Sequence, residues 1–350
     1  MSELQNAKAK VQINPLQIDI QYRNQVTYIK QVIERLRLNL SGRVILTEIG
    51  SAFYMYTPII ALLAGAQRVY AWTSDSQYGA GKEISEKCMS LCTMVEMENK
   101  IEISVNEKPE THIQKADIIT NSGFLRPINK RFINNIKYGA VIALMYESWE
   151  LRGQDIDIEF CREKGIRVAG TWENDPLIKV FDCIGSLAVK LAMEAGYEIT
   201  NNNILVWSND DFGEVISRSF KALGANQVVQ TTDTARLYGI LQQIDFIFIC
   251  DYDEIRNYTT GANAVWDLKK MASINQSFGI VHLYGEINSF DLDKFNISLY
   301  PKKNGKAMFM SQTLGYIGFR PIINLNAAGF KVAECMIKGE SHSLVQPITY

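Results

Sequence analysis

Residues 204–229 read ILVWSNDDFGEVISRSFKALGANQVV, and this stretch decides the fold. An apolar run, ILVW, is followed by a short polar turn, then by a segment with helical spacing of its apolar residues, then by a second apolar run. A buried strand that leads through a turn and a helix into another strand is the repeating unit of a parallel sheet. The stretch therefore predicts a parallel sheet covered by helices.

The turn in this stretch lies where a dinucleotide-binding domain holds its phosphates. That turn normally has the pattern GxGxxG, in which the second glycine lets the backbone approach the pyrophosphate and the third lets the helix pack on the strand. The three places hold Ser208, Asp210 and Gly213, so only the packing glycine is kept. A carboxylate at the second place repels a diphosphate unless it turns away or meets a cation. We expect NAD or NADP to bind weakly or not at all.

The candidate cofactor contacts lie in this turn and at the end of the next predicted strand. Asp233 comes 20 residues after Gly213, near the place where a carboxylate would hold an adenosine ribose, although Thr231 is nearer to the expected strand end. The candidate cofactor residues are Ser208, Asn209, Asp210, Phe212, Gly213, Thr231 and Asp233. A domain that has stopped binding nucleotides is the alternative.

Strands and helices alternate on both sides of a polar hinge at residues 201–203. This alternation predicts an α/β protein with two Rossmann-like domains, each built on a parallel sheet. We expect an N-terminal substrate domain over 1–198, a dinucleotide-binding-like domain over 199–320, and a C-terminal strand and helix over 321–350 that return to the first domain. The length of 350 residues also favours two domains.

Composition narrows the classes of function. The 36 Lys and Arg residues are spread along the chain and balanced by 38 Asp and Glu residues, so nucleic acid is not an expected partner. No apolar segment is long enough to span a bilayer, and no secretory signal is recognisable at the start, so a cytoplasmic location is expected. Cys88 and Cys92 have a spacing that could offer two metal ligands, but no further Cys or His lies near them, so no metal site is expected.

Four segments suggest a family. They are CREKGIRVAG (161–170), IDFIFICDYDE (244–254), SFGIVHLYGEINSFDL (277–292) and IINLNAAGFKVAECMIKGE (322–340). Their order resembles that in the D-isomer-specific 2-hydroxyacid dehydrogenases and, more loosely, in the formate and glycerate dehydrogenase-like two-domain proteins. The resemblance implies that the first segment leads into the cofactor domain, the second faces the nicotinamide ribose, and the last is a strand and helix returning to the first domain.

The departures from this family fall on its catalytic positions. The family's substrate-binding arginine falls at Tyr284 and its acid/base histidine near Asn326. A tyrosine cannot hold a carboxylate with two parallel hydrogen bonds, and an asparagine cannot pass a proton. The resemblance thus implies an NAD(P)-linked oxidoreductase with altered catalytic residues, acting on a small polar metabolite. The alternative is a non-redox nucleotide- or metabolite-binding accessory protein.

Polar side chains that follow predicted strand ends are the candidates for an active site. His282, Tyr284 and Glu286 are the candidate catalytic residues, because ligands of α/β sheets bind at the carboxyl ends of strands and His282 suits proton transfer at neutral pH. The candidate substrate contacts are Asn121, Arg126, Glu147 and Asn326, with Arg126 as the anion anchor. We expect both sets to share a cleft between the halves. A small-molecule metabolite is the expected partner, and a homodimer stays open.

The first half also has a rival interpretation. In RVILTEIGSAFYMYTPIIALLAGAQRVYAWTSDS (43–76) an acidic residue precedes Gly50 and a second acid, Asp75, follows the next strand. This layout looks like the opening of an S-adenosylmethionine-dependent methyltransferase. Ala52 and Tyr54 stand where further glycines are expected, and their side chains would crowd the methionine group. A methyltransferase-like enzyme is therefore the second alternative.

Overall fold

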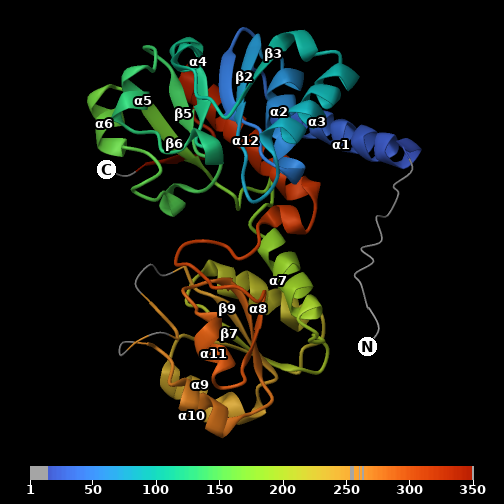
Figure 1. The fold of residues 1–350 in the computed structure, drawn as a ribbon, viewed down its shortest axis with the longest axis vertical. Helices are drawn as coiled ribbons and strands as arrows, with labels where there is room; N and C mark the ends of the chain where they lie inside the picture. Colours follow the sequence, from blue (N-terminus) through green and yellow to red (C-terminus); the bar gives the residue numbers. More distant parts are fainter. Residues whose placement is uncertain (1–14, 253–255, 260, 262–263, 349–350) are drawn as a thin grey trace, which may run out of the picture.

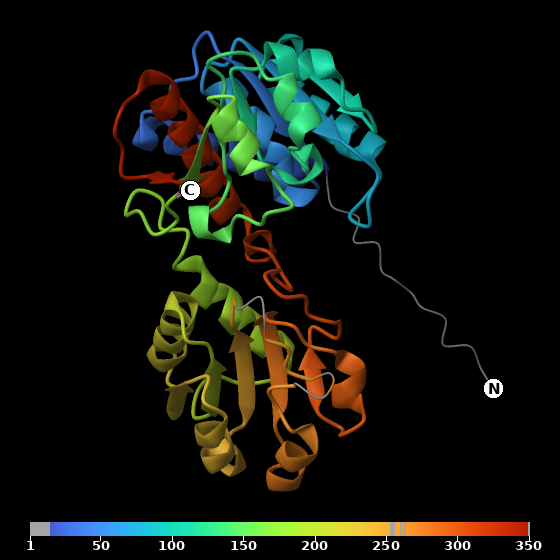
Figure 2. The ribbon, with the colours of Figure 1, turned by 90° about the vertical axis from the view of Figure 1, so that its left-hand side faces the viewer.

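The computed structural model describes residues 15–252, 256–259, 261 and 264–348, which form two α/β lobes stacked along the long axis of the molecule (Figure 1). The chain crosses from the upper to the lower lobe on the way into α7 (Cys183–Glu194) and returns before α12 (Phe319–Lys338) (Figure 2). Each lobe has its own sheet, one of seven strands and one of five. The prediction of two Rossmann-like domains is confirmed.

The upper lobe contains the seven-stranded sheet, in the order β12-β6-β5-β4-β1-β2-β3. Its strands are β1 (Val44–Glu48), β2 (Arg68–Thr73), β3 (Ile101–Val105), β4 (Ile118–Thr120), β5 (Val141–Ala143), β6 (Arg167–Thr171) and β12 (Val345–Pro347). β12 pairs antiparallel with β6, and the other pairs are parallel. The parallel strands have the order found in doubly wound dinucleotide-binding domains, whose switch point here lies between β1 and β4.

Helices cover both faces of this sheet because neighbouring strand residues point to opposite sides. Ile45 belongs to the core cluster beneath α1, α2, α3 and α12, whereas Leu46 belongs to the cluster beneath α4, α5 and α6. These helices are α1 (Pro15–Leu36), α2 (Thr57–Leu63), α3 (Gly81–Met94), α4 (Glu110–Lys115), α5 (Lys130–Asn134) and α6 (Ile158–Glu163). Short 3-10 helices add η1 (Ala52–Tyr56), η2 (Glu98–Lys100), η3 (Gly123–Leu125) and η4 (Ser148–Glu150).

The C-terminal segment returns to the upper lobe, as predicted, but the order of its elements differs. The segment 322–340 is predicted to begin with a strand, but its residues 322–338 lie inside α12, and the strand β12 comes after the helix. α12 packs on α1, α2, β5 and β6, so nearly every side of it is buried. A helix buried on nearly all sides has mostly apolar residues at every position, so periodicity alone does not distinguish its start from a buried strand.

The lower lobe contains the five-stranded sheet, in the order β11-β10-β9-β7-β8. Its strands are β7 (Asn203–Trp207), β8 (Gln227–Gln230), β9 (Phe246–Cys250), β10 (Gly279–Tyr284) and β11 (Ser298–Tyr300). All neighbouring pairs are parallel. The chain goes from β7 outward to β8 and then to β9 on the other side, so the switch point of this sheet lies between β7 and β9.

The sequence predicts helices over residues 178–196 and 262–272, and the corresponding helices of the lower lobe begin later. α7 begins at Cys183 rather than near residue 178, and it packs on α8 (Asp211–Ala222) and β10, although the predicted domain boundary at 198 lies after it. α10 (Leu268–Ile274) begins where Asp267 accepts a hydrogen bond from the Lys270 amide, and residues 262–263 of the predicted helix lie outside the described residues. The remaining elements are α9 (Thr234–Ile240), η5 (Leu241–Gln243), α11 (Ser289–Asp293) and η6 (Leu314–Tyr316). No helix in the described part of the chain is both long and apolar enough to cross a membrane.

Candidate functional site

A cleft of about 820 Å³ lies between the two lobes. The first lobe and the linker after it contribute Glu147, Trp149, Leu151, Trp172, Asn174 and Phe181, and the second lobe contributes Asn209, Asp210, Asp211, Phe212, Asp251, Tyr252 and Met308. The second set surrounds the carboxyl ends of β7 and β9, which is the switch point of the lower sheet. Ligands of α/β sheets bind at such points, and the volume suits a small molecule.

The turn after β7 is closed by its own carboxylate. Asp210 Oδ1 accepts hydrogen bonds from Ser208 Oγ at 2.7 Å and from the Gly213 amide at 3.3 Å, so Asp210 caps the start of α8. In a dinucleotide-binding domain, amides at this helix start would bind the diphosphate. Burial raises the pKa of Asp210, while the hydrogen bond from Ser208 opposes this shift.

Gly213 lets α8 pack closely on β7, which is the role of the third glycine in the GxGxxG turn. A Cβ atom on Gly213 would lie 2.6 Å from Ser208 Cβ and 2.5 Å from Gln230 Nε2, so any side chain there would push α8 away from the sheet. The close approach of helix and strand requires this glycine. The turn therefore has the packing glycine of a dinucleotide-binding turn, and the Asp210 carboxylate accepts hydrogen bonds at the helix start where such a turn binds the diphosphate.

Aromatic rings form one wall of the cleft and join the two lobes. The Trp149 ring lies 4.8 Å from the Tyr252 ring at 84° and 5.5 Å from the Phe212 ring. Phe212 also stacks on Phe181 at 4.9 Å. Tyr252 Oη donates to the Glu150 carbonyl at 3.4 Å. Because Trp149 is 44% exposed, part of its ring stays accessible from the cleft.

Asp251 is the most deeply buried carboxylate on the cleft, with 1% of the residue exposed. Its Oδ2 accepts hydrogen bonds from Arg256 Nη1 at 3.0 Å and from the Tyr258 hydroxyl. Among the residues that the structure describes, no hydrogen bond reaches Oδ1. Two hydrogen bonds thus fix the side chain through Oδ2, and Oδ1 is available to accept a hydrogen bond from a ligand.

Three glutamates support the upper side of the cleft. Glu147 accepts hydrogen bonds from Trp149 Nε1 at 2.5 Å, the Glu173 amide at 2.9 Å and Gln346 Nε2 at 3.3 Å. Burial raises the pKa of Glu150 to about 7, and the charge of Glu147 adds to the shift. Burial also raises the pKa of Glu173, together with the charges of Glu150 and Glu147. Glu147 orients the Trp149 ring, and Glu150 has a pKa near neutral pH.

The three predicted catalytic residues do not come together in the cleft. His282 is fully buried on β10, with Nε2 at 2.7 Å from the Gly285 carbonyl oxygen, and burial lowers its pKa to about 4. Glu286 is exposed and accepts from Asn257 Nδ2 at 3.1 Å. Tyr284 packs behind the cleft wall, 5.3 Å from the Phe212 ring. The catalytic roles of these residues stay predictions, and the burial of His282 argues against a proton transfer to a ligand in the cleft.

Of the predicted substrate contacts, only Glu147 lines the cleft. Asn121 Oδ1 accepts from the Met145 amide at 2.8 Å and holds the ends of β4 and β5 together. Arg126 pairs with Asp155 at 2.9 Å, so the predicted anion anchor is engaged within the first lobe. Asn326 lies on α12 and donates to Thr57 Oγ1 at 3.1 Å.

The predicted cofactor contacts divide into two groups. Asn209, Asp210 and Phe212 line the cleft, with Ser208 and Gly213 directly behind them. Thr231 and Asp233 instead organise the start of α9. Thr231 Oγ1 accepts from the Asp233 amide at 3.0 Å, and Asp233 caps the helix by accepting from the Ala235 amide at 2.8 Å.

Several cleft residues were not identified from the sequence. Asp251 and Tyr252 directly follow β9, and Trp172 directly follows β6. All three therefore follow strand ends, where the sequence pattern of a parallel sheet predicts ligand contacts. Met308 lies on an irregular segment, and no sequence signal indicates it.

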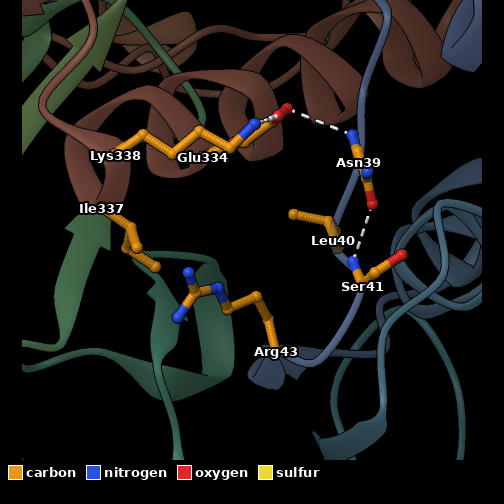
Figure 3. A pocket seen from close by; sticks show the side chains of 7 residues that line it. All are labelled: Asn39, Leu40, Ser41, Arg43, Glu334, Ile337 and Lys338. Atoms are coloured by element: carbon orange, nitrogen blue, oxygen red, sulfur yellow. Dashed lines mark hydrogen bonds and ion pairs between the residues drawn. The ribbon is translucent and has the colours of Figure 1, made fainter.

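A second pocket lies beside the C-terminal end of α12 (Figure 3). Its volume is about 80 Å³, far below the range of small-molecule sites. The Arg43 guanidinium reaches toward its middle, and Lys338 is paired with Glu334 at 2.5 Å on its rim. The interlobe cleft is the candidate site because its volume is about 820 Å³, against about 80 Å³ for this pocket.

The residues behind the methyltransferase interpretation have structural roles in the first lobe. Asp75 accepts from the Gly81 amide at 2.8 Å and from Asn106 Nδ2 at 3.0 Å, and a Cβ on Gly50 would lie 2.6 Å from Tyr54 Cβ. Cys88 and Cys92 are buried free thiols. Within the described ranges, no group of three or more His, Cys, Asp or Glu side chains is arranged to hold a metal ion.

Fold and cleft together define a two-domain Rossmann-like protein with an interdomain site. No family model and no curated protein matches the chain. Two solved structures of dipicolinate synthase chains are similar to it. The one from Bacillus halodurans has a TM-score of 0.52 and 11% identity, covering 87% of this chain and 99% of its own. The one from Bacillus subtilis has the same TM-score and 15% identity, covering 87% and 100%.

A pyruvate reductase of Chlamydomonas reinhardtii is similar to the same extent. Its TM-score is 0.52 at 10% identity, over 87% of this chain and 99% of its own. Identities this low show a shared fold and nothing finer. The resemblance to two-domain dehydrogenase-like proteins that the sequence predicted is thus confirmed for the fold.

Proposed function

We propose that the chain binds a small metabolite in the interlobe cleft, and that it does so without a dinucleotide on the turn at residues 208–213. The carboxylate of Asp210 at the start of α8 carries this proposal. A diphosphate at this place would have to displace Asp210 from Ser208 and Gly213 and would then face its negative charge. The turn does not fit a diphosphate in this conformation. A small-molecule metabolite is thereby the proposed partner, and the homodimer stays a prediction.

An NAD(P)-linked oxidoreductase with altered catalytic residues is the second candidate. The position of the cleft favours it, because the switch point between β7 and β9 is where a doubly wound domain holds its nucleotide. One protein of similar fold is named a pyruvate reductase. The chemistry of the lining favours a metabolite-binding protein without a dinucleotide, whereas the location of the cleft favours an oxidoreductase. The affinity for NADH and NADPH distinguishes these two functions.

Isothermal titration calorimetry with NADH and NADPH tests the proposal. For the wild-type protein we expect no saturable binding in the micromolar range. Asp210→Gly frees the α8 amides and removes the repulsion, so it should tighten binding about tenfold or more. Glu214→Gln is the matched control, because it removes one exposed negative charge from the same helix turn without opening it.

A micromolar dissociation constant for the wild-type protein would contradict the proposal and favour the oxidoreductase. Weaker binding by Asp210→Gly than by the wild type would refute the argument from repulsion. Equal gains from Asp210→Gly and Glu214→Gln would show that general charge, and not the closed turn, sets the affinity.

A further inference from the structure

We infer that the ligand of the interlobe cleft is a protonated primary or secondary amine carried on an apolar body. This inference rests on the proposed function, namely that a small metabolite occupies the cleft. Three features of the lining support it: its charge, its aromatic wall and the Asp251 carboxylate, of which one oxygen accepts no hydrogen bond from the described residues.

The charge of the lining favours a cation over an anion. Four of the lining residues are acidic: Glu147, Asp210, Asp211 and Asp251. No Lys, Arg or His is found among the lining residues in the described part of the chain. Arg256 is paired with Asp251 and offsets part of this charge. A concave site with charges of one sign concentrates ligands of the opposite sign.

The aromatic wall suits a cation with an apolar body. Trp149, Trp172, Phe181, Phe212 and Tyr252 supply rings to the lining. Trp149 and Tyr252 stand nearly perpendicular to each other at 4.8 Å, so they form a corner rather than a flat stack. The hydrogen bond to Glu147 fixes the Trp149 ring. Ring faces attract cations and bury apolar groups without needing a hydrogen bond.

Asp251 identifies the kind of cation. Its Oδ2 is held by Arg256 and Tyr258, whereas Oδ1 has no hydrogen-bond donor among the described residues. A carboxylate oxygen in a largely buried residue favours a ligand that donates a hydrogen bond to it. A protonated primary or secondary amine can donate an N–H, and a quaternary ammonium cannot. The amine therefore fits at Asp251 Oδ1, with its apolar body on the Trp149–Tyr252 corner.

Three probes of the same shape and different charge test the inference. They are 2-phenylethylamine, 2-phenylethanol and phenylacetate, titrated into the full chain by calorimetry. The amine should bind about tenfold more tightly than the alcohol, and phenylacetate should not bind. Trimethyl(2-phenylethyl)ammonium should bind more weakly than the primary amine, because it cannot donate to Asp251.

Variants show whether the predicted residues cause the preference. Asp251→Asn should reduce the amine affinity about tenfold and leave the alcohol affinity unchanged. Because this change also affects Arg256 and Tyr258, Asp211→Asn serves as a second variant. Asp211 is an exposed lining residue, and the loss of its charge should lower the affinity for the amine about two- to threefold. Glu83→Gln, an exposed charge on α3, is the control and should change nothing.

The outcomes separate this inference from the proposed function. Equal affinity for amine and alcohol, or tighter binding of phenylacetate, would overturn the inference that the ligand is an amine. The proposal that a metabolite binds in the cleft would still stand. If none of the probes binds, the inference that the ligand is an amine is also wrong. The titration with NADH and NADPH would then be the only test of the proposed function. Tight binding of NADH by the wild-type protein would reject the proposed function whatever the amine does.

Discussion

Asp210 lines the cleft from the second lobe and Glu150 lies between the lining residues Trp149 and Leu151 of the first, and the surroundings of these two carboxyl groups differ. Asp210 accepts hydrogen bonds from Ser208 and from the start of α8, and these bonds favour its charged form against burial. Glu150 accepts one long bond of 3.3 Å from the Glu147 amide and lies close to the charge of Glu147. Hydrogen bonds to a carboxylate favour ionisation, whereas burial beside a like charge opposes it. Glu150 is therefore a carboxyl group next to the cleft lining whose charge changes near neutral pH.

Glu150→Gln tests this difference through the pH dependence of stability. The folded state raises the pKa of Glu150 from 4.5 to about 7, so the folded protein binds more protons than the unfolded chain between these values. The contribution of Glu150 to stability is fully present below pH 4.5 and is lost as pH rises to about 7. At pH 8 the neutral glutamine should be more stable than the wild type by about 1–2 kcal/mol.

Urea unfolding at pH 5 and pH 8 measures this effect. The difference between Glu150→Gln and the wild type should appear at pH 8 and shrink at pH 5. Glu83→Gln controls for the general loss of one negative charge, since Glu83 is exposed. An identical pH slope for Glu150→Gln and the wild type would show that Glu150 is ionised in the folded protein at neutral pH.

At the scale of elements, α12 shows what a sequence pattern can and cannot predict. The return of the C-terminal segment to the first lobe follows from the order of segments, but its internal structure does not. Asn324 and Asn326 interrupt the apolar run, and each finds a partner far away in sequence, Asn324 at the Ile178 carbonyl and Asn326 at Thr57. Partners at such separations cannot be read from local sequence, because local spacing predicts only periodicity.

The short helix η4 is the element that places Trp149 on the cleft, and it packs on β6 without spare room. A Cβ atom on Gly170 of β6 would lie 2.8 Å from Ser148 Cα. Backbone cannot yield as a flexible side chain can, so Gly170→Ala should shift η4 and cost about 1–3 kcal/mol of stability. We also expect a changed tryptophan emission spectrum, because Trp149 moves with η4.

Gly153→Ala is a matched control in the same lobe, since no atom lies within 4 Å of a Cβ placed there. Its stability, measured by urea unfolding, should stay within about 0.5 kcal/mol of the wild type. If Gly170→Ala were as stable as Gly153→Ala, with an unchanged emission spectrum, then η4 and β6 would not be tightly packed.

At the scale of the whole molecule, the alternation of strands and helices predicts two lobes and the edge of each sheet where a site can form. It does not predict which side chains reach that site. Arg126 and Glu147 both follow strand ends, but Asp155, 29 residues further on, holds Arg126 inside the first lobe. Trp149 reaches the cleft because Glu147 holds its ring from two residues away. Which side chains reach the cleft depends on their tertiary partners. The sequence therefore predicts the region of the site and only part of its lining.

The aromatic contacts between the lobes predict how the molecule responds when they are removed. Trp149→Ala deletes the ring pairs with Phe212 and Tyr252 and the hydrogen bond to Glu147. Aromatic pairs are worth about 0.5–1.5 kcal/mol each beyond burial, so the docking of the lobes should weaken by about 1–3 kcal/mol. The two chain crossings remain, so each lobe should stay folded while their relative position loosens.

Small-angle scattering and urea unfolding together measure this loosening. For Trp149→Ala we expect a larger radius of gyration and an unfolding curve that broadens or separates into two transitions, one for each lobe. Tyr138→Ala is the control, because Tyr138 is a fully exposed aromatic residue and its removal takes away no contact between the lobes. A Trp149→Ala protein with the scattering curve and single transition of the wild type would show that the lobes are held by the chain crossings and α7 instead. In that case the aromatic wall would serve the ligand alone, and its rings could be exchanged without changing the arrangement of the lobes.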